Sequence, residues 1–267
     1  MPRAPQIRSA SKMTLAMYFE IEDSNVRVGG TMHRVPRGQP LAHWVHDAIR
    51  WASLIYLEHS KEESDQGRYA SWKSRPLVQR LRRSWPRIEA RFQSDPGRLQ
   101  HLSRLKPFAV PSDVLNGVPT DEGAEYLALA RSKKSRLPGP RIDYLETADQ
   151  AYALADGVSD AVWDDAVDWA LDNPDSFKIV LERSYRAWVS GDFDEVDRLS
   201  SHYTRNRFPE IRHAVIAARN SLWIPTIREL VQSANAPTLV LVGAAHLGGP
   251  DGLVSQLAAG GIRLTKC

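Results

Sequence analysis

The chain has 267 residues, of which 42% are hydrophobic and 25% are charged. These fractions are typical of a globular protein and exclude a disordered, collagen-like or coiled-coil chain. Lys and Arg outnumber Asp and Glu by only 35 to 32, so the net charge gives no reason to expect nucleic-acid binding. No apolar run approaches the ~20 residues of a membrane span, and the single cysteine, Cys267, excludes a disulfide framework.

The N-terminal residues 1–12 form a basic tail, which we expect to be disordered. No apolar segment of ~7–15 residues follows the tail, so we expect no secretory signal and a cytoplasmic location. Residues 13–267 are predicted to form a single domain. Its first element is a β-hairpin, in which a strand over 13–19 is joined by the turn residues 23–25 to a strand that begins at Val26.

A helix over 41–52 follows, because its apolar residues recur three and four positions apart, and a short buried strand is predicted over 54–57. Residues 61–140 are rich in Arg, Ser and Pro, and we expect a mostly helical insertion there, with helices over 77–92 and 123–130. A basic patch in this insertion is interpreted as a solvated helix face rather than a surface for an acidic partner. Its members are Arg75, Arg80, Arg82, Arg83, Arg87 and Arg91.

The second half of the chain begins with a predicted strand over 141–145 and continues as helices. These helices cover 148–155, 160–171, 175–189, 192–203 and 209–233, and Pro225 should kink or break the last one. The chain then returns to strands over 238–242 and 262–265, with a helix over 251–259 between them. The expected fold is therefore α/β, with a mixed sheet built from the N- and C-terminal strands and flanked by helices.

Two copies of a Gly-x-x-His pattern give the sharpest functional signal. Each follows an apolar strand, and they end at His33 and His246. Two further strands end in carboxylates, Glu58 and Glu146. Ligands of open α/β sheets bind outside the carboxyl ends of the strands, so these four side chains are candidates for one site. Two imidazoles and two carboxylates would suit either a divalent metal ion or a general acid–base pair.

Arg219 is expected on the long helix beside its apolar stripe, where a guanidinium needs a partner. It could clamp a substrate carboxylate or an oxyanion, or it could form a structural salt bridge with Glu58 or Glu146. Glu146 could instead cap the helix that begins near Ala148, where a carboxylate suits the helix dipole.

Six segments, in family order, resemble the TraB/PrgY/GumN family, to which the Tiki proteases are related. They are residues 30–36 (Gly-Thr-Met-His-Arg-Val-Pro), 57–58 (Leu-Glu), 144–150 (Tyr-Leu-Glu-Thr-Ala-Asp-Gln), 190–192 (Ser-Gly-Asp), 219–220 (Arg-Asn) and 242–252 (Val-Gly-Ala-Ala-His-Leu-Gly-Gly-Pro-Asp-Gly). The resemblance implies a mixed sheet flanked by helices, with both Gly-x-x-His elements at one site. It also implies a divalent metal ion (Mn, Co or Zn), because Tiki relatives are metal-dependent proteases. The implied metal ligands are His33, His246 and Glu58, the implied catalytic residues are His33, Glu58 and Arg219, and the implied substrate contacts are Glu146, Arg219 and Asn220.

Three functions remain open from the sequence. The first is a metal-dependent hydrolase that acts on a peptide or another amide. The second is a metal-independent hydrolase that resembles the erythromycin esterases, with His33 as the general base. The third is a non-catalytic metal- or haem-binding protein that resembles ChaN. In the first two cases the expected partner is a peptide or small-molecule substrate.

Overall fold

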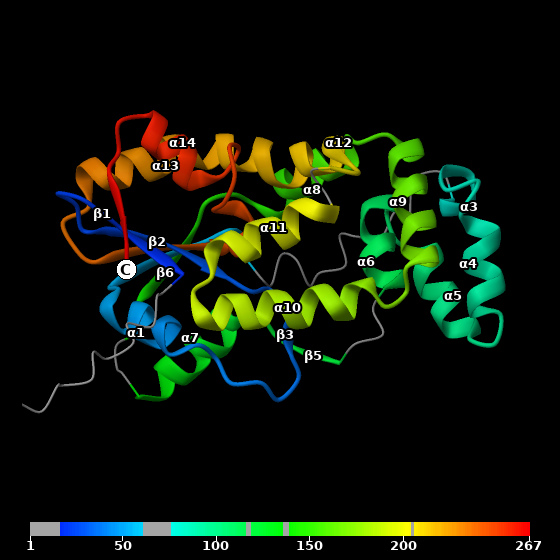
Figure 1. Ribbon diagram of the computed structural model, residues 1–267, viewed down its shortest axis with the longest axis horizontal. Helices are drawn as coiled ribbons and strands as arrows, with labels where there is room; N and C mark the ends of the chain where they lie inside the picture. The colour runs from blue at the N-terminus through cyan, green and yellow to red at the C-terminus, as the bar shows by residue number, and fades with distance from the viewer. Residues whose placement is uncertain (1–16, 61–75, 116–118, 136–138, 204–205) are drawn as a thin grey trace, which may run out of the picture.

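The computed structural model describes residues 17–60, 76–115, 119–135, 139–203 and 206–267 (Figure 1). The predicted tail over 1–12, the part of the predicted first strand over 13–16, and Arg75 lie outside these residues. Within the part that is described, no helix is both long and apolar enough to cross a bilayer.

A mixed six-stranded sheet organises the fold, in the order β6-β4-β7-β2-β1-β8. Its strands are β1 (Tyr18–Ile21), β2 (Val26–Thr31), β4 (Leu54–Leu57), β6 (Arg141–Tyr144), β7 (Thr238–Gly243) and β8 (Leu264–Lys266). Strands β6, β4, β7 and β2 are mutually parallel, whereas β1 is antiparallel to both β2 and β8. The predicted α/β fold and the predicted hairpin are therefore confirmed. A separate two-stranded sheet pairs β3 (Val35–Pro36) with β5 (Thr120–Asp121).

Strand β7 lies between β4 and β2, and all six of its residues are buried. Successive side chains of a strand point to opposite faces. Leu239 and Leu241 accordingly enter the core on one face, and Val240 and Val242 enter the core on the other. An unbroken apolar run is what a parallel strand needs when both faces of its sheet are covered.

Helices cover both faces (Figure 1). The first face packs against α1 (His43–Trp51), α7 (Ala124–Ser135) and α10 (Ser176–Ser190), and the second packs against α13 (Ala218–Ser233) and α14 (Leu253–Ala259). Helix α8 (Ala148–Asp156) begins after β6, and α11 (Phe193–Tyr203) packs beside α10. The long predicted helix is not broken at Pro225. It consists of α12 (Pro209–Arg212), a π-helical turn over His213–Ala217, and α13.

A helical region with its own apolar core forms the end of the molecule remote from the sheet (Figure 1). It contains α3 (Leu77–Arg80), α4 (Trp85–Phe92), α5 (Pro96–Ser103), α6 (Val110–Val114), α9 (Asp160–Asp172) and the 3-10 turn Pro107–Ala109. The described part of the insertion is thus mostly helical, as predicted, although the helix expected over 77–92 is divided into α3 and α4.

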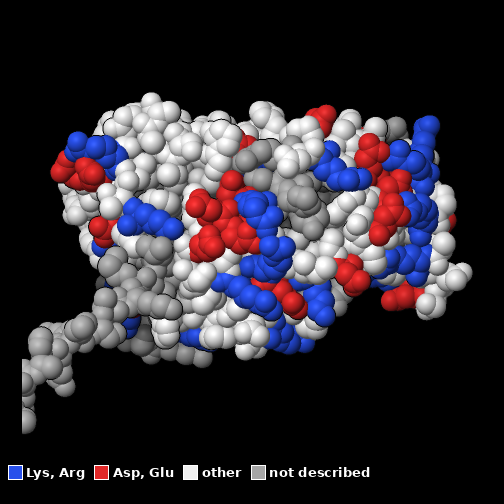
Figure 2. Space-filling model, viewed as in Figure 1, with Lys and Arg blue, Asp and Glu red and all other residues white. Residues whose placement is uncertain are grey.

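The basic patch of the insertion faces acidic side chains of the same chain. Arg80 lies 2.8 Å from Asp160, Nη1 of Arg87 lies 3.0 Å from Asp168, and Arg83 also pairs with Asp168. Figure 2 shows the resulting alternation of acidic and basic side chains over this end of the molecule. Arg82 and Arg91 are exposed. The interpretation as a solvated helix face fits this arrangement, because the positive charge is largely matched within the chain.

Candidate functional site

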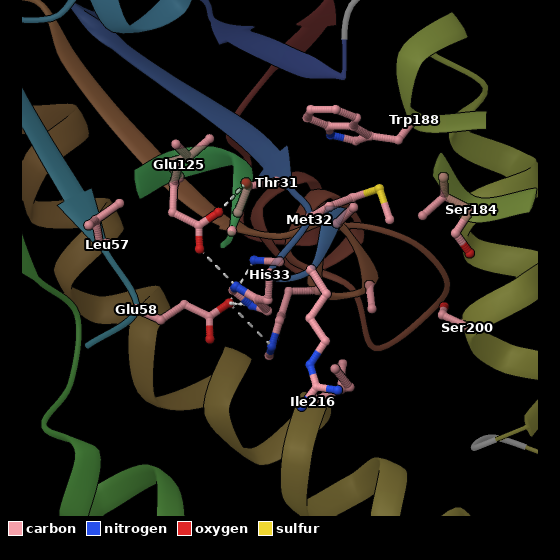
Figure 3. A pocket seen from close by; sticks show the side chains of 18 of the residues that line it. Thr31, Met32, His33, Leu57, Glu58, Glu125, Ser184, Trp188, Ser200 and Ile216 are labelled. Atoms are coloured by element: carbon pink, nitrogen blue, oxygen red, sulfur yellow. Dashed lines mark hydrogen bonds and ion pairs between the residues drawn. The ribbon is translucent and has the colours of Figure 1, made fainter. Parts of the chain in front are cut away.

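Three parallel strands, β2, β4 and β7, end around one cavity of about 710 Å³ (Figure 3). His33 follows β2, Glu58 directly follows β4, and His246 ends a 3-10 turn (Ala244–His246) directly after β7. All three side chains line the cavity together with Arg219 from α13. The structure thus brings together both Gly-x-x-His elements, one strand-end glutamate and the arginine that the sequence singled out. Glu146, which follows β6, lies behind Arg219 and contacts it.

The His33 ring lies between two carboxylates. Its Nδ1 is 3.0 Å from Oε1 of Glu125 and its Nε2 is 3.1 Å from Oε1 of Glu58, while the side chain remains 52% exposed toward the cavity. Carboxylate oxygens accept hydrogen bonds, so both ring nitrogens donate when the ring is protonated. Desolvation opposes this charge, but the charges and hydrogen bonds of Glu58 and Glu125 outweigh it and raise the pKa of His33 well above 6.5.

Glu58 is buried and connects three parts of the site. Its Oε1 accepts from the backbone N–H of Gly243 at 2.6 Å, and its Oε2 accepts from Nη2 of Arg219 at 2.5 Å. Desolvation disfavours its negative charge, but Arg219, His33 and His246 more than compensate and hold the pKa of Glu58 well below its ordinary value. Glu58 is therefore an anion that fixes the surrounding donors.

His246 is held in one orientation. Its Nδ1 donates to Oδ1 of Asn220 at 2.8 Å, and its Nε2 accepts from Nη1 of Arg219 at 3.3 Å. Burial, together with the positive charge of Arg219, outweighs the attraction of Glu58 and lowers the pKa of His246 to about 3. The ring is therefore neutral and packs against Trp223, with 4.6 Å between the ring centroids. Asn220 is fully buried behind this ring, so the structure places it against His246 rather than at the cavity wall.

Arg219 joins the two glutamates. Its Nε lies 2.8 Å from Oε1 of Glu146, and its Nη2 contacts both Glu146 and Glu58. Burial raises the pKa of Glu146 despite this partner. The cap of α8 is formed instead by Thr147 and Gln150, in a reciprocal capping box. The salt-bridge alternative for Arg219 is thus observed, in a position where the same guanidinium also lines the cavity.

Gly243 is required by close approach. A Cβ atom on this residue would stand 2.6 Å from Nε2 of His33 and 3.2 Å from Oε1 of Glu58. The first glycine of the second Gly-x-x-His element therefore leaves room for the histidine of the first. The glycine of this second element is therefore needed for packing, because the end of β7 lies against the residues that follow β2 and β4.

Sequence reasoning missed Glu125. This residue stands in the first turn of α7, is 3% exposed, and accepts from Oγ1 of Thr31 at 2.5 Å in addition to its contact with His33. It lies in the insertion, where no strand end drew attention to it. No local sequence signal could have found it, because its partners Thr31 and His33 lie 94 and 92 positions away. In the structure Gly123 leaves room for it, since a Cβ there would stand 2.5 Å from the Glu125 carboxylate.

A divalent metal ion was expected at these side chains. Among the described residues, however, no group of three or more His, Cys, Asp or Glu side chains is arranged to hold one. The Nε2 atom of His246 and Oε2 of Glu58 both face the guanidinium of Arg219. A cation here would stand against a fixed positive charge and compete for lone pairs already in use. The side chains in this arrangement therefore do not fit a bound divalent metal ion. Metal binding by this chain stays an untested prediction from the sequence.

The model of the TraB/PrgY/gumN family matches residues 18–266, and the chain belongs to this family. Neither the curated proteins nor the solved structures that were searched contain a match to the chain.

Proposed function

We propose that the chain is a hydrolase of esters or amides in which His33 transfers the proton of the attacking water. The observation that carries this proposal is the position of the His33 ring, between two carboxylates and open to the cavity. Glu125 holds the Nδ1–H group and so leaves Nε2 as the working nitrogen, as carboxylates do in other histidine-based hydrolytic sites. The cavity volume of about 710 Å³ lies within the ~300–1,000 Å³ that is usual for small-molecule sites.

The reaction needs the form of His33 that lacks the proton on Nε2. A water molecule in the cavity beside Nε2 can then donate one hydrogen to it. Attack on the carbonyl carbon transfers that proton to Nε2, and the imidazolium returns it to the leaving oxygen or nitrogen. The charge of Arg219, beside Glu58 in the same cavity, would stabilise the negative charge on the carbonyl oxygen.

Hydrolysis of a series of p-nitrophenyl esters, from acetate to hexanoate, and of an anilide by purified protein tests the proposal. We expect His33→Gln to lower kcat/KM by about 10²–10⁴-fold, because it removes a general base. The matched control is His43→Gln, since His43 is an exposed histidine on α1 that does not line the cavity. Equal rates in the wild type and His33→Gln would overturn the proposal.

The metal-dependent hydrolase that the resemblance implies differs in one measurable respect. Protein purified without chelator and refilled with Mn, Co or Zn would then carry about one metal ion per chain, which the His33→Ala/His246→Ala variant would lose. Hydrolysis that survives exhaustive chelation supports the metal-independent reaction instead. A Soret band on haem titration, lost in the same variant and without hydrolysis in the wild type, would support the binding protein.

A further inference from the structure

A second cavity, of about 260 Å³, adjoins the candidate site, and we call it the annex. Its wall is mostly apolar and combines residues of four helices with residues that also line the larger cavity. The apolar members are Leu115, Trp169, Phe177, Val180 and Leu199. The shared members are Ser200, Val215, Ile216 and Ala245.

The shared wall is built from two elements of the candidate site. Val215 and Ile216 belong to the π-helical turn, and Ala245 belongs to the Gly-x-x-His turn and directly precedes His246. A π-helical turn inside a helix is uncommon and often occurs at a functional site. Figure 3 shows Ile216 and Ser200 across the cavity from Glu58, and both residues also line the annex. The annex therefore shares a wall with the candidate site, built from residues next to its catalytic candidates.

The volume of the annex indicates what it can take. At about 260 Å³ it is smaller than the ~300 Å³ at the lower end of small-molecule sites, so it suits one group of a larger ligand. Among the described residues of its wall, Arg212 alone is charged, and its guanidinium is neutralised by two hydrogen bonds to Asp251, of 2.9 and 3.0 Å. The annex thus does not favour an anion. The Nη1 atom of Arg212 is buried without a hydrogen-bond partner among the described residues, so an uncharged oxygen of the ligand would be favoured there.

We infer that the annex binds an uncharged apolar acyl or side-chain group of the substrate, of medium length, while the carbonyl carbon lies at His33. This inference rests on the proposed hydrolase and specifies its substrate class. A mostly apolar wall discriminates between ligands by size. Each methylene group that it accepts can raise kcat/KM about tenfold or more. Short acyl groups would leave the annex empty and would therefore be poor substrates.

The hydrolytic test compares p-nitrophenyl acetate, butanoate and hexanoate. We expect kcat/KM to rise at least about tenfold from acetate to hexanoate in the wild type. Val180→Trp should abolish this preference because the indole fills the annex, and Val180→Phe is the milder alternative if that variant does not fold. The matched control is Ile179→Trp, since Ile179 is the next residue of α10 and is 52% exposed. This control should keep the wild-type preference.

The binding test separates the annex from catalysis. We use 2-heptanone, an apolar chain with one carbonyl oxygen, with acetone as the short control, and follow binding by saturation-transfer NMR. 2-Heptanone should bind the wild type and Ile179→Trp equally, and Val180→Trp at least about tenfold more weakly. Equal binding to Val180→Trp and to the wild type would overturn the inference, whatever the hydrolytic result. If no ester is hydrolysed but this binding pattern is found, the proposed function fails and the annex remains an apolar binding site.

Discussion

His33 is half exposed and yet strongly perturbed, because two carboxylates act on one ring. Since its pKa is raised well above 6.5, the form that can accept a proton becomes populated only at a higher pH than for an ordinary histidine. A general base with this environment should give a rate that increases with pH. The same carboxylates that delay deprotonation make the neutral ring a stronger base once it forms.

Glu125→Gln tests this balance. Removing one negative charge should lower the pKa of His33, so the rise of kcat/KM with pH should move to lower pH, and the plateau rate should fall because the base is weaker. Glu89→Gln, an exposed glutamate on α4, is the matched control. A pH–rate profile identical to that of the wild type would show that Glu125 does not act on the working histidine.

At the scale of residues, the sequence predicted the members of the site that follow strands. His33, Glu58 and His246 were found because a strand end fixes where the next side chains lie. The contact between Arg219 and the glutamates could be anticipated as well, since a charged group on an apolar helix face requires a partner. Glu125 could not be found this way, because its contact joins two segments 92 positions apart and no local pattern encodes that distance.

Among the elements, the turn after β7 sets the geometry of the site. The N–H of Gly243 donates a hydrogen bond to Glu58, and the absence of a Cβ leaves space for the His33 ring. Gly243 therefore positions both side chains. The strands and most helices were predictable from apolar periodicity. The π-helical turn and the unbroken course of α13 through Pro225 were not, because both depend on packing against the sheet and α8 rather than on local propensity.

Gly243→Ala should therefore impair catalysis more than folding. The new methyl group must displace the His33 ring, which can swing toward the open cavity, and a shift of about 1 Å in a catalytic group can cost 10²-fold in rate. Gly97→Ala in α5 is the control, because a Cβ there meets only a side-chain oxygen at 3.5 Å. We expect kcat/KM to fall at least about tenfold with a small change in Tm. A wild-type rate would contradict the assigned packing.

For the whole molecule, the shifted groups set the pH dependence of stability. The pKa of His246 is lowered to about 3, so between pH 6.5 and 3 the unfolded chain binds a proton that the folded chain does not, and stability falls as the pH falls. The lowered pKa of Glu58 adds to this loss at the acid end. The raised pKa of His33 acts oppositely, since its contribution is complete below 6.5 and is lost as the pH rises through the folded-state value.

The free energy of unfolding should therefore be greatest near pH 6.5. On the acid side, His246 alone contributes a slope of about 1.4 kcal/mol per pH unit. Urea unfolding between pH 4 and 9 measures the curve. His246→Asn should flatten the acid limb by that slope, whereas His43→Asn should leave the limb unchanged. An unaltered acid slope in His246→Asn would mean that the imidazole is not held neutral in the fold.

The position of β7 has a consequence for how the chain acquires its structure during synthesis. The ribosome releases β2 and β4 early, but these strands do not touch, because β7 lies between them. Gly243 reaches Glu58 across 185 positions of sequence, so a nascent chain carries two unjoined strand edges until the middle of its sheet arrives. The two halves of the sheet can therefore join only after β7 has been synthesised, with the edge strand β8 following it, and the candidate site cannot form before His246 has been translated.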